Sequence, residues 1–159
     1  MKNANYSIHF TVDQTPDAVF AAINDVRRWW SEGIEGSADA VGAEFVHHVA
    51  EIHRCKLKVL QLVPGKKVVW LVLENHFSFT QDKTEWQGTK IVFDIVEKGT
   101  QTELRFTHEG LVPEYECYEA CSEGWSTYVG SSLRNLIMTR TGRPNVGQPL
   151  TNAERALLG

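Results

Sequence analysis

The chain has few cysteines, no long apolar run and no surplus of positive charge. Its three cysteines, Cys55, Cys117 and Cys121, are too few and odd in number for the disulfide framework of a secreted protein. The first residues lead into alternating sequence without the apolar stretch of a signal peptide, and no window approaches the roughly 18 apolar residues of a membrane-spanning helix. We therefore expect a cytoplasmic protein with reduced thiols and no membrane insertion.

Charge and motif content exclude further classes of protein. The 16 Lys and Arg residues stand against 20 Asp and Glu, a formal net charge of −4, and the longest basic run is Lys66–Lys67. Nucleic-acid binding needs a clustered basic surplus, so we do not expect a nucleic-acid partner. The chain also lacks the glycine-rich nucleotide-binding motifs, the G-x-S-x-G motif of hydrolases and the H-E-x-x-H zinc motif. We therefore predict no cofactor and no metal.

The chain does contain a regular order of elements, and its length fits one domain. Alternating apolar residues predict a first strand over 7–12, and Thr15–Pro16 begins a short helix that is followed by a helical turn over 27–30. Apolar residues at steps of three or four predict one long helix from 114 to about 140. Between them, alternation predicts strands over 43–50, 54–63, 67–73, 89–97 and 102–108.

These elements imply an α+β fold. A curved antiparallel sheet has one face to bury, and the long amphipathic C-terminal helix carries the matching apolar stripe. Such a fold leaves space between its two layers where a small apolar molecule binds. Gly124 and Gly130 lie inside the predicted helix, where each costs about 1 kcal/mol relative to Ala. We expect close packing against another backbone, or a kink, at these two positions.

Four strings in this order resemble one superfamily. They are residues 15–20 with Trp29–Trp30, residues 59–70, residues 105–110 and residues 123–125. The chain resembles the helix-grip superfamily of START-type lipid-transfer domains, plant pathogenesis-related class 10 proteins and polyketide cyclases, and more narrowly the bacterial Hsp90 ATPase activator homologues. The resemblance covers residues 6–141, which we predict to be one domain, and leaves 142–159 as a C-terminal tail. It implies a helix-grip fold with a hydrophobic cavity and no catalytic motif common to all members.

The leading functional hypothesis is binding of a small, largely hydrophobic molecule in a cavity between the sheet and the C-terminal helix. One alternative is an enzyme of the cyclase or dehydratase type in which His108 and Tyr128 steer a proton, so the question of catalysis stays open. Another is a protein-interaction module such as a co-chaperone, which needs an exposed apolar patch. The residues expected to line the cavity are Trp30, Phe45, Trp70, Phe93, Phe106, His108, Trp125 and Tyr128.

Several polar residues have a structural interpretation beside the functional one. His108 is expected to point inward at the end of its strand, where it either serves a ligand or bonds the following turn and fixes the long helix. His47 and His48 are adjacent on a strand and point to opposite faces, so they do not share a metal ion. Cys117 and Cys121 lie one helical turn apart, and we expect a structural role for these thiols.

The outer face of the sheet gives two further expectations. Asp94 is opposite in phase to its apolar neighbours Phe93 and Ile95, so it faces outward. We find no second carboxylate for the inner face, and catalysis by paired carboxylates is therefore not expected. The segment 68–73 is apolar on both faces, which predicts an outer cover formed by the tail, by residues 77–79 or by a second subunit. A homodimer follows from the last of these.

Overall fold

A computed structural model describes residues 5–49, 53–78, 80–81 and 85–144. Within this part of the chain, seven strands form one antiparallel sheet with the order β1-β7-β6-β5-β4-β3-β2. The strands are β1 (Tyr6–Val12), β2 (Glu35–Gly36), β3 (Glu44–Val49), β4 (His53–Val63), β5 (Lys67–Phe77), β6 (Lys90–Lys98) and β7 (Gln101–Glu109). The helices are α1 (Pro16–Asn24), α2 (Val26–Trp29), α3 (Tyr118–Thr127) and α4 (Arg134–Thr139), with a π-helical segment η1 (Tyr128–Leu133) between the last two.

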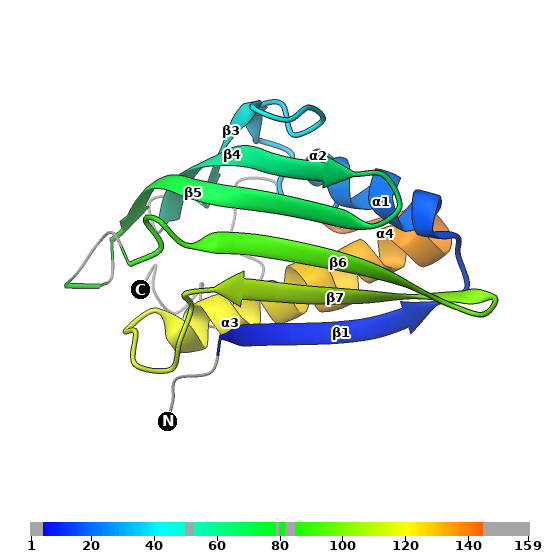
Figure 1. Ribbon diagram of the computed structural model, residues 1–159. Helices are drawn as coiled ribbons and strands as arrows, with labels where there is room; N and C mark the ends of the chain where they lie inside the picture. The colour runs from blue at the N-terminus through cyan, green and yellow to red at the C-terminus, as the bar shows by residue number, and fades with distance from the viewer. Residues whose placement is uncertain (1–4, 50–52, 79, 82–84, 145–159) are drawn as a thin grey trace.

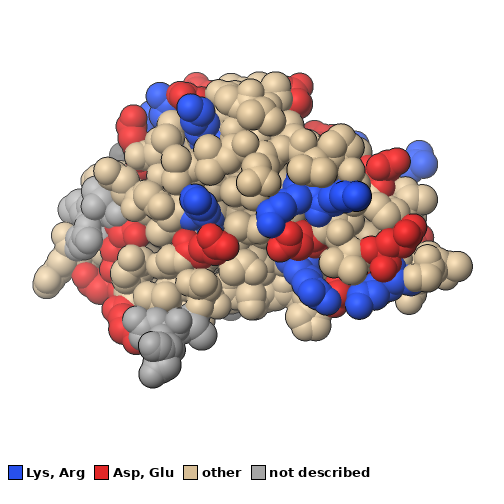
Figure 2. Space-filling view, viewed as in Figure 1, with Lys and Arg blue, Asp and Glu red and all other residues tan. Residues whose placement is uncertain are grey.

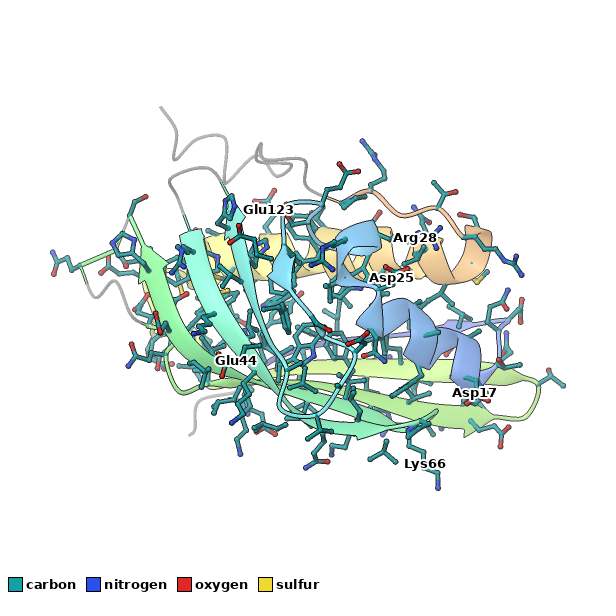
Figure 3. The ribbon with its side chains drawn as sticks, turned by 90° about the horizontal axis from the view of Figure 1, so that it is seen from above. Asp17, Asp25, Arg28, Glu44, Lys66 and Glu123 are labelled. Atoms are coloured by element: carbon teal, nitrogen blue, oxygen red, sulfur yellow. The ribbon has the colours of Figure 1, made fainter. Side chains whose placement is uncertain are left out.

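The sheet curves around the C-terminal helix. Figure 1 shows the strands in front and the continuous helix α3–η1–α4 behind them, with α1 and α2 toward one end. Seen from above in Figure 3, the sheet bends toward the helices, so that its concave face meets them. Among the described residues, no helix is long and apolar enough to cross a membrane. The predicted helix-grip architecture is confirmed.

The first helix begins where the sequence predicts. Thr15 is the N-cap, and its hydroxyl oxygen accepts a hydrogen bond from the backbone N–H of Ala18 at 3.1 Å. Pro16 occupies the first helical position, where its missing N–H costs no hydrogen bond. The buried residues Val19 and Ile23 give the helix one apolar face, which packs on the sheet and on α4.

The predicted register of the sheet is also confirmed. Phe93 and Phe106 pair across β6 and β7, and both side chains are fully buried on the concave face. Asp94 and Arg105, the next pair along, face outward, and the Asp94 carboxylate lies 3.3 Å from the ammonium group of Lys67. Because side chains alternate along a strand, this one pairing fixes the inner and outer sets of both strands.

Two strands differ from the sequence prediction. The strand predicted over 67–73 continues to Phe77, because the buried amide of Asn75 has a hydrogen-bond partner in His53 of the neighbouring strand. A polar residue in that position breaks the apolar alternation on which the prediction relied. The two-residue strand β2 pairs with Val46 and Phe45 and is too short to leave a periodic signal.

The long helix contains 22 residues and starts later than predicted. Residues 114–117 form turns, and the Glu85 carboxylate accepts hydrogen bonds from the backbone N–H groups of Glu116 and Cys117, both at 3.1 Å. A carboxylate from another segment therefore caps the helix, a role that the local sequence does not reveal. The helix ends at Arg140, whose left-handed φ of 66° stops the helical path.

The end of the helix is tied to α2. The Ser132 hydroxyl donates to the carbonyl oxygen of Trp29 at 2.7 Å and accepts from the backbone N–H of Arg143 at 2.7 Å. The Arg28 guanidinium donates to the carbonyl oxygen of Arg140 at 2.7 Å. Gly142 then passes directly beside the Arg28 carbonyl, too close for a side chain. These contacts hold α2, and with it Trp29 and Trp30, against the long helix.

This close approach predicts a matched pair of glycine variants. A Cβ at Gly142 would overlap the Arg28 carbonyl oxygen, so Gly142→Ala is expected to lower the free energy of unfolding by about 1–3 kcal/mol. A Cβ at Gly124 meets no atom within 4 Å, so Gly124→Ala is expected to stabilise the helix by up to about 1 kcal/mol. Urea unfolding of both variants measures the difference, and a destabilised Gly124→Ala would contradict this account.

The explanation predicted for the helical glycines is wrong in one respect. Gly124 has no backbone packed against it, since no atom lies within 4 Å of the position its Cβ would take. The nearest neighbour of Gly130 is the Ile8 side chain at 3.5 Å, which is ordinary contact. Gly130 instead lies within the π-helical segment η1, a local change of helical geometry that fits the second predicted reason, a kink.

Candidate ligand-binding site

All five tryptophans of the chain meet between the sheet and the helices, and none is more than 4% exposed. Trp30 lies at the centre, with ring centroids 5.9 Å from Trp29, 5.8 Å from Trp70 and 5.1 Å from Trp125. Trp86 extends the group by stacking on Trp125 at 5.6 Å. We call these five rings, with the buried Phe and His rings that touch them, the aromatic layer.

The structure brings all the predicted lining residues except Tyr128 together in this layer. Phe45 contacts Trp70 at 5.1 Å, and Phe106 contacts both Phe93 at 5.1 Å and Trp125 at 4.8 Å. Tyr128 is buried three residues further along the helix than Trp125. All eight are buried, namely Trp30, Phe45, Trp70, Phe93, Phe106, His108, Trp125 and Tyr128. Whether they contact a ligand stays a prediction.

Sequence reasoning missed five members of the layer, namely Trp29, Trp86, Phe77, His47 and His53. Trp86 lies in the connection between β5 and β6, outside any periodic pattern, and it packs at the edges of Phe77 and His53. The sequence pattern indicates only a helical turn at Trp29, whereas its ring stacks on Trp70. The His47–His48 pair raises only the question of a metal site, and nothing in the sequence pattern places His47 against Trp30. The count of five tryptophans was the available signal, and sequence alone does not indicate which of them meet.

Both ring nitrogens of His108 form hydrogen bonds. The indole N–H of Trp125 donates to Nδ1 at 3.1 Å, which assigns the proton of the neutral ring to Nε2. Nε2 then donates to the Thr89 hydroxyl oxygen at 2.8 Å, and that hydroxyl donates to the carbonyl of Trp86 at 2.6 Å. The ring therefore links β7, the start of β6 and the long helix. In this arrangement neither nitrogen is left to exchange a proton with a ligand.

The other two inward histidines come from β3 and β4. His47 stacks on Trp30 with a centroid separation of 4.1 Å, whereas its neighbour His48 is exposed, as alternation predicts. His53 donates from Nε2 to the Asn75 side-chain oxygen at 2.7 Å and stacks on Phe77 at 4.3 Å. The ring of His53 lies 5.8 Å from that of His47.

Burial keeps all three imidazoles uncharged. It lowers the pKa of His53 to about 4, although the hydrogen bond with Asn75 opposes this change. It lowers the pKa of His108 to about 3, with a smaller contribution from the positive charge that His53 can carry. It also lowers the pKa of His47 well below 6.5, and His53 and His48 lower it further. At neutral pH the layer therefore contains polar atoms but no imidazolium charge.

The buried thiols show no sign of activation. Cys55, Cys117 and Cys121 are all free and buried. Burial raises the pKa of the Cys121 thiol well above its usual value, and the neighbouring Cys117 thiol raises it further. Reactive cysteines have lowered pKa values, so the Cys121 thiol is a poor nucleophile. Among the described residues, no three His, Cys, Asp or Glu side chains are placed to hold one metal ion.

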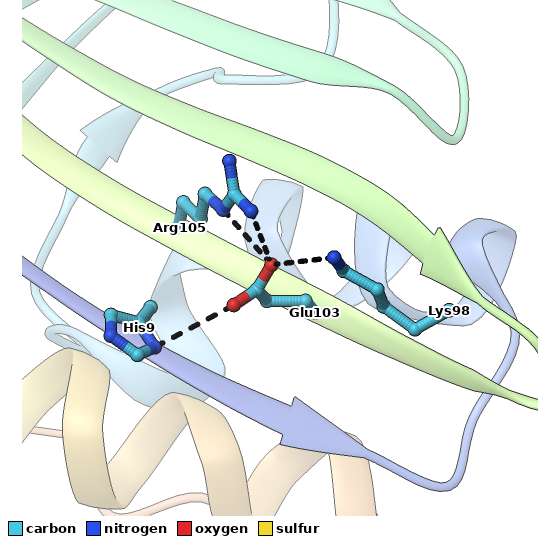
Figure 4. Close-up of polar contacts among 4 residues, drawn as sticks. All are labelled: His9, Lys98, Glu103 and Arg105. Atoms are coloured by element: carbon cyan, nitrogen blue, oxygen red, sulfur yellow. Dashed lines mark hydrogen bonds and ion pairs between the residues drawn. The ribbon is translucent and has the colours of Figure 1, made fainter.

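Charged residues lie on the outer, convex face. Figure 2 shows Lys and Arg interspersed with Asp and Glu over the strands, without a field of one sign. In Figure 4 the Glu103 carboxylate accepts from Arg105 at 2.9 Å and lies 3.9 Å from Lys98 Nζ and 3.6 Å from His9 Nδ1. The side chains of Arg105, Lys98 and His9 are more than half exposed, so pairs of this kind contribute about 1 kcal/mol or less. The charged side chains thus lie on the outer face of the sheet, whereas the uncharged aromatic layer lies on its inner face.

Two hollows open on the surface away from the aromatic layer. One, of about 560 Å³, lies between the start of α1 and the β4–β5 hairpin and includes Asp17 and Lys66, both labelled in Figure 3. The other, of about 280 Å³, lies between α1 and α4 and includes Asp25 and Arg28, which form an ion pair at 3.6 Å. Neither hollow includes any of the eight predicted lining residues.

A family model described as Activator of Hsp90 ATPase homolog 1-like protein matches residues 13–138. The chain belongs to this family. The match confirms the family resemblance and lies within the predicted domain, residues 6–141, whose boundaries stay a prediction. A search of curated proteins found no match. Residues 145–159, most of the predicted tail, lie outside the described part of the chain.

Solved structures share the fold of this Activator of Hsp90 ATPase homolog 1-like domain at low identity. The Aha1 dimer from Colwellia psychrerythraea is 23% identical, with a TM-score of 0.70 over 87% of this chain and 99% of that one. The Mll3558 protein from Rhizobium loti is 21% identical, with a TM-score of 0.65 over 81% and 94%. CalU16 from Micromonospora echinospora is 14% identical, with a TM-score of 0.62 over 86% and 77%. At these identities the likeness establishes the fold alone.

Proposed function

We propose that this domain binds a small, largely hydrophobic molecule in a cavity between the concave face of the sheet and the helix α3–η1–α4. The observation that carries the proposal is the aromatic layer itself. It gathers five Trp rings and three uncharged His rings in one buried region. Ligand sites are lined mainly by apolar and aromatic side chains with a few polar groups that orient the ligand, and this layer has that composition.

The polar nitrogens of the aromatic layer also favour ligand binding over simple core packing. Aliphatic residues fill a core without polar atoms, whereas each buried imidazole or indole nitrogen needs a hydrogen-bond partner. Placing three histidines in the layer therefore adds a requirement that packing alone does not impose. Two of them, His53 and His108, have protein partners for a ring nitrogen. A bound ligand would explain why the third histidine, His47, also lies in the layer.

A neutral fluorescent probe tests the proposal. N-phenyl-1-naphthylamine emits strongly only in apolar surroundings, and we expect it to bind at one site per chain with micromolar affinity and to be displaced by excess naphthalene. The variants Val41→Ser and Met138→Ser remove exposed apolar side chains and are expected to leave the titration unchanged. No enhancement, a signal that never saturates, or a signal lost in these surface variants would contradict binding inside the domain.

We further propose that the chain forms a homodimer through the outer face of β5 and β6. Leu71 and Leu73 of β5 are only half-buried there, and they lie beside the Val69–Val92 pair, which is already buried within one chain. Light scattering is expected to give twice the 18.0 kDa mass of one chain, and Leu71→Glu is expected to halve it. A single-chain mass for the unmodified protein at every concentration would contradict the dimer.

A further inference from the structure

The hollow between α1 and α4 has an apolar floor and a charged rim. Three alanines of α1 and two buried aliphatic residues of α4 form the floor, and the small alanine side chains leave space between the two helices. In Figure 3 the rim residues Asp25 and Arg28 lie where α1 passes into α2, beside α4. The floor therefore suits a short apolar chain. The whole lining consists of Gln14, Ala18, Ala21, Ala22, Asp25, Arg28, Leu136, Ile137 and Arg140.

The charges at the rim do not balance. Arg28 already has protein partners, since its guanidinium donates to the Arg140 carbonyl oxygen at 2.7 Å and lies 3.6 Å from the Asp25 carboxylate. The Arg140 guanidinium, in contrast, forms no hydrogen bond or ion pair with any other described residue. Two guanidinium groups and one carboxylate give the lining a formal charge of +1. The hollow therefore favours a ligand with one negative charge.

The backbone at Arg140 supports a role for its side chain. Arg140 ends α4 with a φ of 66°, and among the described residues it is the only one other than glycine with a positive φ. Helices commonly end in this conformation, but glycine is the usual residue there because it has no Cβ to cause strain. Residues held in such conformations are concentrated at functional sites. A requirement for a guanidinium group at the hollow explains why an arginine occupies a position that favours glycine.

We propose that this hollow binds a short aliphatic carboxylate, with its carboxylate group on the Arg140 guanidinium and its alkyl chain along the floor between α1 and α4. A planar carboxylate forms two parallel hydrogen bonds with a guanidinium, which a single hydroxyl group cannot do. One carboxylate also matches the charge of the lining, whereas a phosphate monoester carries nearly two negative charges at neutral pH.

The lining also favours a free acid over the end of a peptide. Among the described lining residues, Gln14 is the one uncharged polar side chain, so the amide groups of a peptide would find few hydrogen-bond partners. The hollow shares no residue with the aromatic layer. The inference therefore goes beyond the proposed function, and either one can fail without the other.

Titration with sodium hexanoate at pH 7, followed in two-dimensional ¹H–¹⁵N spectra, tests the inference. We expect a dissociation constant of about 1 mM and shifts concentrated at the backbone amides of α1 and α4. Four further probes separate the contributions. 1-Hexanol lacks the charge, protonated hexylamine reverses it, hexyl phosphate increases it, and N-acetyl-leucine represents the end of a peptide. Each is expected to bind at least about fivefold more weakly than hexanoate.

Three variants identify the groups that bind hexanoate. Arg140→Gln removes the guanidinium without the partners of Arg28 and is expected to weaken hexanoate binding about tenfold while leaving 1-hexanol binding unchanged. The matched control Arg134→Gln removes an exposed guanidinium of the same helix that does not line the hollow, and it is expected to retain hexanoate affinity. Ala21→Leu fills the hollow from an exposed position on α1 and is expected to abolish the binding of hexanoate.

Several results would overturn the inference. They are the absence of shifts, shifts confined to the aromatic layer, equal affinity for 1-hexanol, and unchanged hexanoate affinity in Arg140→Gln. Tighter binding of hexyl phosphate would overturn the assignment of a carboxylate, and tighter binding of N-acetyl-leucine would overturn that of a free acid. If Arg140→Gln does not fold, the order of the five affinities in the unmodified protein, together with Ala21→Leu, decides.

Discussion

Acidification from about pH 7 to about pH 4 is expected to unfold the domain, because its three inward histidines are buried without charge. The pKa is about 4 for His53 and about 3 for His108 in the folded protein, against 6.5 for a free imidazole. Below pH 6.5 the unfolded chain therefore binds protons that the folded chain does not. Stability that is fully present above pH 6.5 is lost progressively as the pH falls toward these lower values.

The expected effect is large. One pKa unit corresponds to about 1.4 kcal/mol, so His53 and His108 each account for about 3–5 kcal/mol between neutral pH and their folded-state pKa values. His47 adds to this in the same direction. The total stability of a domain is about 5–15 kcal/mol. Protonation of these groups is therefore enough to unfold the protein.

Urea unfolding at several pH values, followed by near-ultraviolet circular dichroism, measures this loss. His53→Gln retains a donor for Asn75 but does not titrate, so its stability is expected to fall about 2 kcal/mol less than that of the unmodified protein between pH 7 and pH 5. The control His48→Gln changes an exposed histidine beside His47 and is expected to follow the unmodified protein. Stability that stays constant down to pH 4.5 would contradict the uncharged burial of these rings.

Replacement of Trp30 by Ala is expected to lower the free energy of unfolding by about 3–5 kcal/mol, because it removes the ring at the centre of the aromatic layer. The Trp30 ring lies 4.1–6.4 Å from the ring centroids of its neighbours. These neighbours are Trp29, Phe45, His47, Trp70 and Trp125. A loss of this size in a domain of this length corresponds to a melting temperature about 10 °C lower.

Thermal unfolding with a surface control measures the effect of Trp30. Val41→Ala removes apolar atoms from a side chain that is 63% exposed, and it is expected to change stability by less than about 0.5 kcal/mol. A Trp30→Ala loss below about 1 kcal/mol would mean that the ring fits loosely among its neighbours and that the layer is not a packed unit.

The sequence was sufficient to predict most of the fold because periodicity is a local property. Alternation along β6 and β7 placed Phe93 and Phe106 inward and Asp94 outward, and the structure confirms all three positions. Thr15 and Pro16 marked the start of α1 through the chemistry of a helix N-terminus. Each of these features depends on residues close in the chain, so the sequence contains the information that specifies it.

The candidate site could be predicted less well from the sequence, because it depends on contacts between residues that are distant in the chain. His108 bonds Thr89 and Trp125, which lie 19 and 17 residues away, and Trp86 enters the layer from a connection without periodic pattern. The ring nitrogens without a partner, on His47, Trp70 and Trp86, are visible only once the other polar atoms of the layer are placed. Sequence reasoning found inward aromatic residues but not this hydrogen-bond arrangement.

The central claim is that a small, largely hydrophobic molecule binds against the aromatic layer, and the indole N–H resonances of the five tryptophans test it most directly. In a two-dimensional ¹H–¹⁵N spectrum each indole gives one cross-peak, and Trp70→Phe assigns the Trp70 peak by its absence. We predict that saturating naphthalene shifts the Trp70 peak, because an aromatic probe bound against the layer changes the ring-current field at the indoles packed there. Five unchanged cross-peaks at saturating probe would contradict the account.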